Sequence, residues 1–376
     1  MHTEAWIQDA WDAAARKIAA RTSRRIGAEF PHGSHDGRYQ VTEPSYWTAG
    51  FWPGLLWLLY RDDGEPRLKK VAEACEERMD EVLADVGRLD HDMGFMWTLT
   101  SLANWQITGS ATSARRAMTA ASHLAGRFNI NGRFIRAWNQ PERTGWAIID
   151  CLMNLPLLHW AAKHADDPRF RHIAIAHAET AVRHFVRPDG SAHHIVRFDP
   201  ETGERLGTLG GQGYADGSAW ARGAAWAIYG AALSHAHTGR VEFRDASERA
   251  AAFFLANSPA DHIPYWDFRL PVAEQAQAPK DSSAAAIAAS GLLDLAAAVR
   301  GDKQTEYREQ ATAILRSLTD RCLAGDDEEA ILLHGTGNLP MGQNVDRPLI
   351  YGDFFYMEAL AKLRGHSSFW SPQPQP

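Results

Sequence analysis

The chain has 376 residues, 45% of them hydrophobic and 23% charged, with 18 Pro, 30 Gly and 3 Cys, which is the composition of an ordinary globular protein. This composition excludes a disordered chain, a collagen-like repeat and a small disulfide scaffold. The formal net charge of −7 argues against a nucleic-acid partner, because such binding depends on clustered Lys and Arg.

The thiols and the N-terminal segment indicate a compartment. Cys75, Cys151 and Cys322 are far apart and odd in number, which favours a reducing environment. The first twenty residues form a charged amphipathic stretch and do not resemble a signal peptide. No apolar run approaches the roughly 20 residues that cross a bilayer. We therefore expect a cytoplasmic protein with no membrane partner.

In chain order, charged amphipathic segments alternate with segments that are apolar nearly all round. Within 68–86, apolar residues recur at spacings of three and four with Lys and Glu between them, which predicts a helix with a solvent-facing side. Such segments occupy 4–20, 68–86, 110–127, 167–187, 241–257 and 303–322. The apolar segments, which predict helices buried on every side, begin at Tyr46, Asp92, Thr144, Asp216, Asp281 and Tyr351.

Six buried helices that alternate with six exposed ones predict an all-α fold, an (α/α)6 barrel with inner and outer rings. An open solenoid of helix pairs is the alternative, but solenoids keep a fixed period, whereas the intervals here are unequal. The outer-to-inner connections are long and rich in Gly and aromatic residues, and we expect short strands in them at one end of the barrel. We expect residues 1–370 to form a single domain and 371–376 a flexible tail.

The most informative candidate for chemistry is Asp150, because it lies in the apolar run WAIIDCLMNLPLL. A carboxylate there costs free energy unless it is paired or neutral, and burial raises its pKa, which makes it a candidate proton donor. The alternative is a structural Asp hydrogen-bonded to a nearby loop. Asp92 begins another buried helix, and taken alone it is more typical of an N-cap.

Two carboxylates at the starts of inner helices suggest acid–base work on a sugar. Trp residues support this interpretation, because several of them fall in or beside the proposed mouth: Trp47, Trp138, Trp220 and Trp226. Arg222 is four residues from Trp226, hence on one helical face, and its guanidinium could bind a substrate carboxylate. The alternative role for Arg222 is a salt bridge to Asp216 or to another acid of the inner ring.

Other candidate sites are weaker. The run GTLGGQGYADG lacks the Lys-Ser/Thr ending of a phosphate loop, and we expect an ordinary loop. The His residues form no HExxH motif and have no Cys partner, so we expect no metal. Cys151 lies inside a buried apolar segment, where a neutral thiol is expected rather than a nucleophile.

The ordered motifs WTAGFWPG, LDHDMGF, GWAIIDCLMNLPLL, DGSAWARGAAWAIYG, KDSSAAA and IYGDFFYMEAL resemble those of the unsaturated glucuronyl hydrolases, glycoside hydrolase family 88, over nearly the whole chain. The resemblance implies an (α/α)6 barrel that needs no cofactor. It also implies a substrate, the di- or oligosaccharides left by polysaccharide lyases, from which the terminal 4,5-unsaturated uronic acid is removed.

The resemblance also implies roles for individual residues. Asp150 would protonate C4 of the sugar and help deliver water to C5, after which the hemiketal opens, and Asp92 would orient the ring. The implied substrate-contacting set is Trp47, Trp138, His194, Gln212, Trp220, Arg222 and Trp226. For the His contact, the neighbouring His193 is the alternative to His194.

Within the resemblance, the segment HGTGNLPMGQNVDRPLIYGD lacks the Ser/Lys pattern of members that prefer sulfated disaccharides, which favours unsulfated substrates. Three alternatives stay open at this stage. They are the related unsaturated rhamnogalacturonyl hydrolases, a barrel-type polysaccharide lyase, and a non-catalytic saccharide-binding or interaction scaffold in which the Trp residues are core. The oligomeric state is left undetermined.

Overall fold

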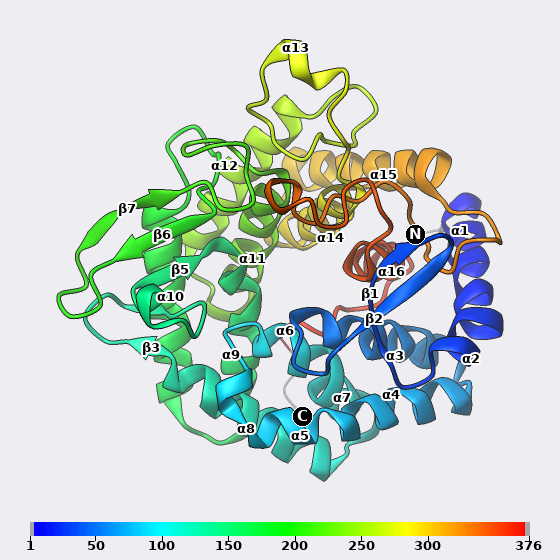
Figure 1. The fold of residues 1–376 in the computed structure, drawn as a ribbon, viewed down its shortest axis with the longest axis horizontal. Coiled ribbons are helices and arrows are strands. Elements are labelled where there is room, and N and C mark those ends of the chain that lie inside the picture. The colour runs from blue at the N-terminus through cyan, green and yellow to red at the C-terminus, as the bar shows by residue number, and fades with distance from the viewer. Residues whose placement is uncertain (1–3, 373–376) are drawn as a thin grey trace.

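In the computed structural model, which describes residues 4–372, the helices form two concentric rings (Figure 1). The inner ring consists of α3 (Phe51–Asp63), α6 (Met93–Trp97) with its continuation α7 (Ala103–Thr108), α9 (Leu155–His164), α11 (Ala221–Thr238), α14 (Ser282–Ala298) and α16 (Ile350–Leu363). The outer ring consists of α1 (Ala5–Lys17), α4 (Pro66–Arg78), α8 (Ala111–Gly126), α10 (Pro168–His184), α12 (Val241–Asn257) and α15 (Asp302–Cys322). Shorter helices are α2 (Ser23–Ile26), α5 (Asp80–Ala84) and α13 (Val272–Gln275).

The inner ring is closed. The last inner helix, α16, contacts both α14 and the first inner helix α3, and it also contacts α1 of the outer ring. Each outer helix precedes an inner one in the sequence, as the alternation of charged and apolar segments predicts. The (α/α)6 barrel is therefore confirmed, and the open solenoid is wrong.

The burial of the two kinds of helix explains the two sequence patterns. In α14 every residue from Ser282 to Leu293 is buried, whereas α15 exposes one side along its whole length. The inner helices also approach closely, because a Cβ at Gly291 of α14 would collide with the backbone of Tyr229 on α11. One hydrophobic cluster runs through the described residues from Ile7 to Trp370.

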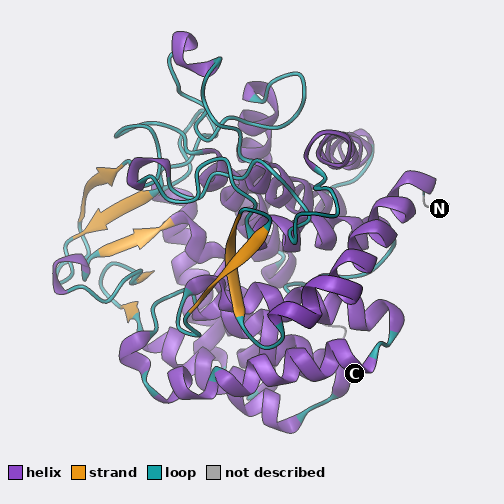
Figure 2. Ribbon diagram, turned by 45° about the vertical axis from the view of Figure 1, so that its right-hand side comes forward, coloured by secondary structure: helices purple, strands orange, loops and turns teal. Residues whose placement is uncertain are grey.

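Short strands lie in the outer-to-inner connections, as predicted, and Figure 2 shows that strands and long loops gather toward one side of the molecule. They form two antiparallel hairpins and one three-stranded antiparallel sheet of order β5-β6-β7. The strands are β1 (Phe30–His35), β2 (Arg38–Thr42), β3 (Phe128–Asn129), β4 (Phe134–Ile135), β5 (Trp146–Ile148), β6 (Ile195–Phe198) and β7 (Arg205–Leu209). The connections thus form an irregular layer over the ends where the inner helices begin.

Two predicted helix starts are wrong. The segment from Thr144 is not helical at first, because Trp146–Ile148 pairs with β6 as β5, and a 3₁₀ helix, Ile149–Asn154, then leads into α9. The helix predicted from Asp216 begins at Ala221, because the Asp216 carboxylate accepts a hydrogen bond from Gly210 N at 2.6 Å and closes a turn instead. Both errors lie in the layer of connections, where tertiary pairing overrides the helical pattern.

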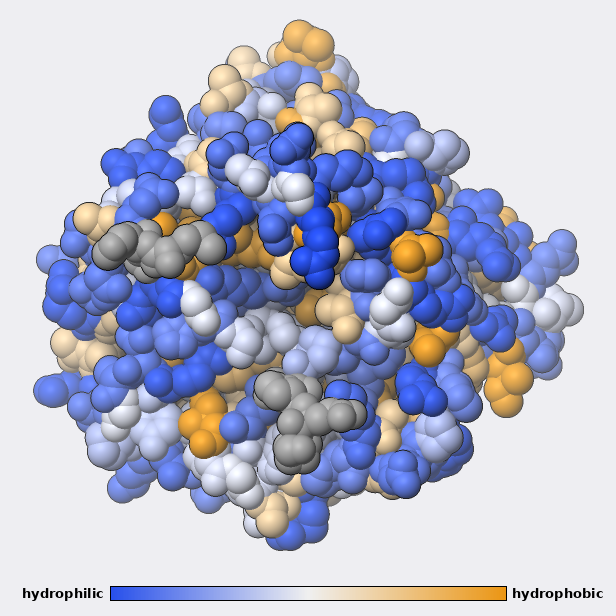
Figure 3. Space-filling model, turned by 180° about the vertical axis from the view of Figure 1, so that it is seen from behind, coloured by the Kyte–Doolittle hydropathy of each residue, from blue (hydrophilic) through white to orange (hydrophobic). Residues whose placement is uncertain are grey.

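The face opposite the view of Figure 1 is mainly hydrophilic, with scattered apolar side chains (Figure 3). None of the helices between residues 4 and 372 combines the length and the apolar character needed to cross a membrane. Of the predicted tail, residues 373–376 lie outside the described part of the chain.

Candidate active site

Asp92 and Asp150 stand at the starts of two neighbouring inner helices. Asp92 directly precedes α6, and Asp150 lies in the 3₁₀ segment before α9. Phe95 N donates to Asn154 Oδ1 at 2.7 Å, and a Cβ at Gly94 would collide with Asn154. Glycine therefore permits a close approach of the two segments, and this approach brings the two carboxyl groups into electrostatic contact.

Burial makes both carboxyl groups weak acids. It raises the pKa of Asp150 to about 7; the Asp92 charge acts in the same direction, and the Arg222 charge opposes it. Burial also raises the pKa of Asp92 to about 7, against the effects of the Asn154 amide and of Arg127. Near neutral pH this pair can therefore hold a proton that a strained or electron-rich substrate accepts.

The hydrogen bonds separate the two interpretations that the sequence left open. Within residues 4–372, the buried Oδ1 of Asp150 has no hydrogen-bond partner, and the hydrogen bond that does reach the carboxyl group comes from the Asp150 backbone itself, so Asp150 is not tied to a loop. Asp92 stands at the N-cap position of α6, but its side chain makes no capping hydrogen bond. Its Oδ1 lies 3.5 Å from His91 Nε2 instead. Both carboxyl groups are thus available for chemistry.

Arg222 is held by protein groups on both terminal nitrogens. Nη1 donates to Asp281 Oδ2 at 2.9 Å and to Thr336 O at 2.7 Å. Nη2 donates to Gln212 Oε1 at 2.7 Å and to Gly337 O at 2.6 Å. The salt bridge expected as the alternative role is present, and its acid is Asp281 rather than Asp216.

His194 belongs to the site, and His193 faces away from it. His194 is buried, its ring centroid lies 4.5 Å from that of Trp220, and its Nδ1 accepts a hydrogen bond from Gln212 N at 2.9 Å. Burial lowers the pKa of His194 to about 3, so the ring is neutral. His193 instead contacts the guanidinium of Arg187 at 2.9 Å.

The predicted Trp residues occupy different depths. Trp47 is partly exposed and lies 4.9 Å from Tyr351, ring centroid to centroid. Trp220 is buried under the Arg222 guanidinium, 4.4 Å from its ring centroid. Trp226 is only 1% exposed and is in contact with Phe95 beneath the site, so it forms the floor. Of these three rings, Trp47 alone lines the polar pocket described below, and Trp220 and Trp226 are buried beneath it.

Trp138 lies on a separate platform beside the three-stranded sheet. Its ring centroid is 6.1 Å from that of Trp146, and the Arg143 guanidinium carbon lies 5.2 Å from each ring. The backbone links the platform to the carboxyl pair, since His91 N donates to Ala137 O at 3.2 Å. Trp138 is thus placed at the edge of the site rather than in its centre.

A polar pocket of about 70 Å³ opens beside Arg222. Trp47, Gln212 and Arg222 line it, and they are joined by residues that the sequence analysis did not single out as site residues: His32, Tyr46, Gly337, Asn338, Gln343, Asn344 and Tyr351. Tyr46 and Tyr351 stand at starts of predicted inner helices, which was a usable signal. His32 lies on β1, and no sequence pattern pointed to it.

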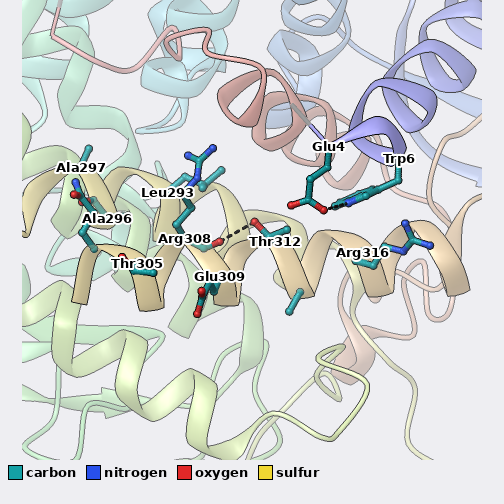
Figure 4. Close-up of a pocket in the computed structure, with 12 residues that line it drawn as sticks. Glu4, Trp6, Leu293, Ala296, Ala297, Thr305, Arg308, Glu309, Thr312 and Arg316 are labelled. Carbon is teal, nitrogen blue, oxygen red and sulfur yellow. Dashed lines mark hydrogen bonds between the residues drawn. The ribbon is translucent and has the colours of Figure 1, made fainter. Parts of the chain in front are cut away.

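A larger hollow of about 950 Å³ lies elsewhere, between the start of α1 and the helices α14 and α15 (Figure 4). Figure 4 shows Glu4 and Trp6 on one side and the α15 side chains Arg308, Thr312 and Arg316 on the other. Volume alone does not make this groove the active site, because no predicted site residue lines it, whereas Trp47, Gln212 and Arg222 line the smaller polar pocket.

Two further expectations concern thiol and metal chemistry. Burial raises the pKa of the Cys151 thiol well above its ordinary value, in agreement with a neutral, structural thiol. Cys75 and Cys322 are also buried, and none of the three is in a disulfide. Across the described residues, no three His, Cys, Asp or Glu side chains are grouped so that they could hold a metal ion.

Comparison with known proteins agrees with this geometry. The model of Glycosyl Hydrolase Family 88 matches residues 19–370. The chain is 37% identical to an unsaturated glucuronyl hydrolase of Bacillus sp. (strain GL1), over 97% of this chain and 98% of that protein.

Solved structures show the same similarity. The crystal structure of the unsaturated glucuronyl hydrolase from Bacillus sp. GL1 has a TM-score of 0.93 at 35% identity, covering 97% of this chain and 100% of the other. A mutant of the unsaturated glucuronyl hydrolase from Streptococcus agalactiae, complexed with dGlcA-GalNAc6S, has a TM-score of 0.83 at 31% identity, covering 97% and 93%.

Proposed function

This chain belongs to glycoside hydrolase family 88, and we propose that it removes the terminal 4,5-unsaturated uronic acid from oligosaccharides released by polysaccharide lyases. The observation that carries the proposal is the carboxyl group of Asp150. Burial raises its pKa to about 7, its buried Oδ1 has no hydrogen-bond partner in the described protein, and it is in electrostatic contact with Arg222, which lines the polar pocket.

The reaction is hydration of the C4=C5 double bond. Asp150 donates its proton to C4, and the ring oxygen stabilises the positive charge that develops at C5. A water molecule then adds to C5 and returns a proton to Asp150, which restores the acid. The hemiketal at C5 opens to a ketone, the hemiacetal left at C1 collapses to an aldehyde, and the remaining sugar leaves as an alcohol. One water is consumed, and no step calls for a cofactor.

The other site residues bind and orient the sugar. Asp92 raises the pKa of Asp150 and holds the ring in position for protonation. Trp47 offers a partly exposed aromatic face, the neutral His194 offers its unpartnered Nε2, and Gln212 offers its amide. Trp220 and Trp226 support this surface from below, and Trp138 receives the next sugar at the edge of the site.

The substrate class follows from the pocket wall. Residues 337–344 present Gly and neutral amides to the pocket rather than a cation, so we propose that unsulfated disaccharides are preferred. We also treat residues 1–370 as one catalytic domain, which a single hydrophobic cluster from Ile7 to Trp370 supports, and 371–376 as a tail. A cytoplasmic location is part of the same proposal, supported by three free thiols.

The proposal is tested with lyase-generated disaccharides from hyaluronan, chondroitin, gellan, xanthan and ulvan. The enol-ether ultraviolet absorbance should disappear on incubation, and faster for unsulfated than for sulfated chondroitin disaccharides. Absorbance that persists across all glucuronyl and galacturonyl substrates would overturn the proposed activity, and a rise in absorbance on intact polysaccharide would indicate a lyase.

Isotopes distinguish hydration from direct displacement at the glycosidic carbon. In D₂O the product should carry deuterium at C4, because the Asp150 proton exchanges with solvent. In H₂¹⁸O the label should enter at C5. Label that enters only at C1, with the double bond still present in the released sugar, would contradict hydration.

A further inference from the structure

We propose that Asp281 is a positioning residue of this site: it fixes Arg222, and Arg222 in turn fixes Gln212 so that the Gln212 amide N–H groups face the bound sugar. The inference rests on the proposed function and deepens it. It also changes the part assigned to Arg222, which the sequence suggested as a direct clamp for a substrate carboxylate.

The hydrogen bonds of Arg222 leave little of its guanidinium for a ligand. A guanidinium carries five N–H donors, two on each terminal nitrogen and one on Nε. Both donors on Nη1 are used by Asp281 Oδ2 and Thr336 O, and both on Nη2 by Gln212 Oε1 and Gly337 O. Among the described residues, Nε–H alone has no hydrogen-bond acceptor, so a two-pronged grip on a carboxylate would require breaking existing bonds.

The same bonds determine how Gln212 is oriented. A guanidinium can only donate, so the group of Gln212 that meets Nη2 must be the carbonyl oxygen Oε1. The amide nitrogen then lies on the other side of the side chain, and Gln212 lines the polar pocket. Its backbone is fixed as well, because Gln212 N donates to His194 Nδ1 at 2.9 Å. Arg222 thus turns Gln212 into an oriented donor.

Asp281 in turn fixes Arg222. It is fully buried at the N-cap of α14, where Oδ1 accepts from Ser283 N at 3.1 Å, Ala284 N at 3.3 Å and Thr336 N at 3.3 Å. With Oδ1 anchored by the helix start and by the 334–349 loop, Oδ2 is left for Arg222. Three elements, α14, α11 and the loop, therefore meet at the Arg222–Asp281 ion pair. This ion pair determines the direction in which the Gln212 amide points.

The first test is Asp281→Asn. Asn is also a good N-cap, so the helix start is retained, but the negative partner of Arg222 is lost. We expect KM for the unsaturated disaccharide to rise about tenfold, the order of one lost hydrogen bond, with a smaller change in kcat.

The pH profile gives a second readout that a merely structural role would not move. Without the Asp281 charge, the positive charge of Arg222 acts unopposed on Asp150 and lowers its pKa. Activity that needs protonated Asp150 should then be lost at lower pH than in the parent. The elements packed against the Asp150 segment are α6, α9, α10 and α11. The charged groups that act on the Asp150 carboxyl group are Asp92 and Arg222, and the neighbouring Cys151 is neutral. Burial lowers the pKa of His91 to about 4 and the pKa values of His177 and His194 to about 3, so these nearby imidazoles are neutral as well. Of all these groups, only Asp92 and Arg222 carry charge near neutral pH.

Arg222→Lys keeps the positive charge but cannot satisfy four acceptors, and it serves if Asp281→Asn fails to fold. This variant should raise KM while the alkaline limb of the profile stays at the parent's pH. An unchanged KM would overturn the inference. Asp353→Asn is the matched control, because Asp353 is another buried carboxyl group at the start of an inner helix that accepts loop N–H groups. Asp353→Asn should lower thermal stability without shifting KM or the alkaline limb of the pH profile.

A double-mutant cycle tests whether Asp281 acts through Gln212. Gln212→Met is nearly isosteric and removes the amide. If Asp281 acts through Arg222 on Gln212, Asp281→Asn should raise KM far less in the Gln212→Met background than in the parent. Independent, multiplicative effects of the two substitutions on KM would overturn the positioning role.

Disaccharide binding to the Asp150→Asn protein, followed by tryptophan fluorescence, separates the two proposals. A parent that neither consumes nor binds the disaccharide would overturn both; an active parent with an unaltered Asp281→Asn profile would overturn only the positioning role.

Discussion

Two pairs of aspartates occupy the same place in the barrel, at the starts of inner helices, and differ in their hydrogen bonds. Asp92 and Asp150, before α6 and α9, receive little from the protein, and the buried Oδ1 of Asp150 has no partner. Asp281 and Asp353, at α14 and α16, accept backbone N–H groups from the 323–349 connection and a further donor each, Arg222 and the Tyr39 hydroxyl. The first pair is available to a substrate. Asp281 holds the loop that walls the site, and Asp353 holds Ile331 and Leu332, which do not line the pocket.

The comparison also shows that a raised pKa does not identify a catalytic acid. Burial raises the pKa of Asp353 to about 7, the same value as for Asp150, even though hydrogen bonds from Tyr39 and two backbone N–H groups oppose the shift. What distinguishes Asp150 is a buried Oδ1 that has no hydrogen-bond partner in the described residues. Hydrogen-bond satisfaction, and not acidity, separates the two pairs.

The strongest test of the difference between the two pairs is to neutralise one acid from each pair. Asp150→Asn should lower kcat by about a thousandfold, because the proton donor is lost. Asp353→Asn should leave kcat within about twofold, because Asp353 supports only the loop. Initial rates of absorbance loss at saturating disaccharide measure both. A comparable fall in the two variants would remove the distinction between the pairs.

Asp92→Asn should have a smaller effect on rate, about a hundredfold in kcat, since the donor remains while its orientation is impaired. The pH profile should shift as well. The Asp92 charge raises the pKa of Asp150, so its removal lowers that pKa, and activity should be lost at lower pH. If the alkaline limb of the pH–activity profile of Asp92→Asn stays in place or moves to higher pH, the two carboxyl groups are not coupled.

Stability should move in opposite directions in the two pairs. The folded-state pKa of Asp150 is raised from 3.8 to about 7, so its ionisation destabilises the folded state progressively as the pH rises through that interval. Asp150→Asn should therefore raise the free energy of unfolding by about 1–3 kcal/mol at pH 8 and by less at pH 5. Asp353→Asn should lower it by about 1–3 kcal/mol at pH 5, because hydrogen bonds are lost, and by less at pH 8, because the pKa of Asp353 is also raised to about 7. Urea unfolding at the two pH values checks the signs.

The smallest effect is expected at the edge of the site. Trp138→Ala should raise KM several-fold, by about 1 kcal/mol of lost stacking, with little change in kcat. Trp105→Ala is the matched control, since Trp105 is also partly buried but is in contact with Trp160 and His164 away from the carboxyl pair. Equal KM changes in the two variants would contradict the placement of Trp138 beside the substrate.

The sequence determined the architecture because one kind of helix is apolar on every side and the other is charged on one side. Residues 282–293 are apolar or small on every side, and 303–322 are charged on one side, so an inner and an outer ring follow from hydrophobic periodicity alone. The same pattern made Asp150 conspicuous, since a carboxyl group inside an apolar run needs a reason to be there.

Only the tertiary structure decided how the site is assembled. Residues 146–148 became a strand because β6 was available to pair with them, and no local pattern contains that information. His32 joined the pocket, and Asp281 rather than Asp216 became the partner of Arg222, through contacts between segments more than fifty residues apart. Periodicity reports which face of a helix is buried, whereas the partner of a polar group is set by where distant loops cross, and that depends on the closed ring as a whole.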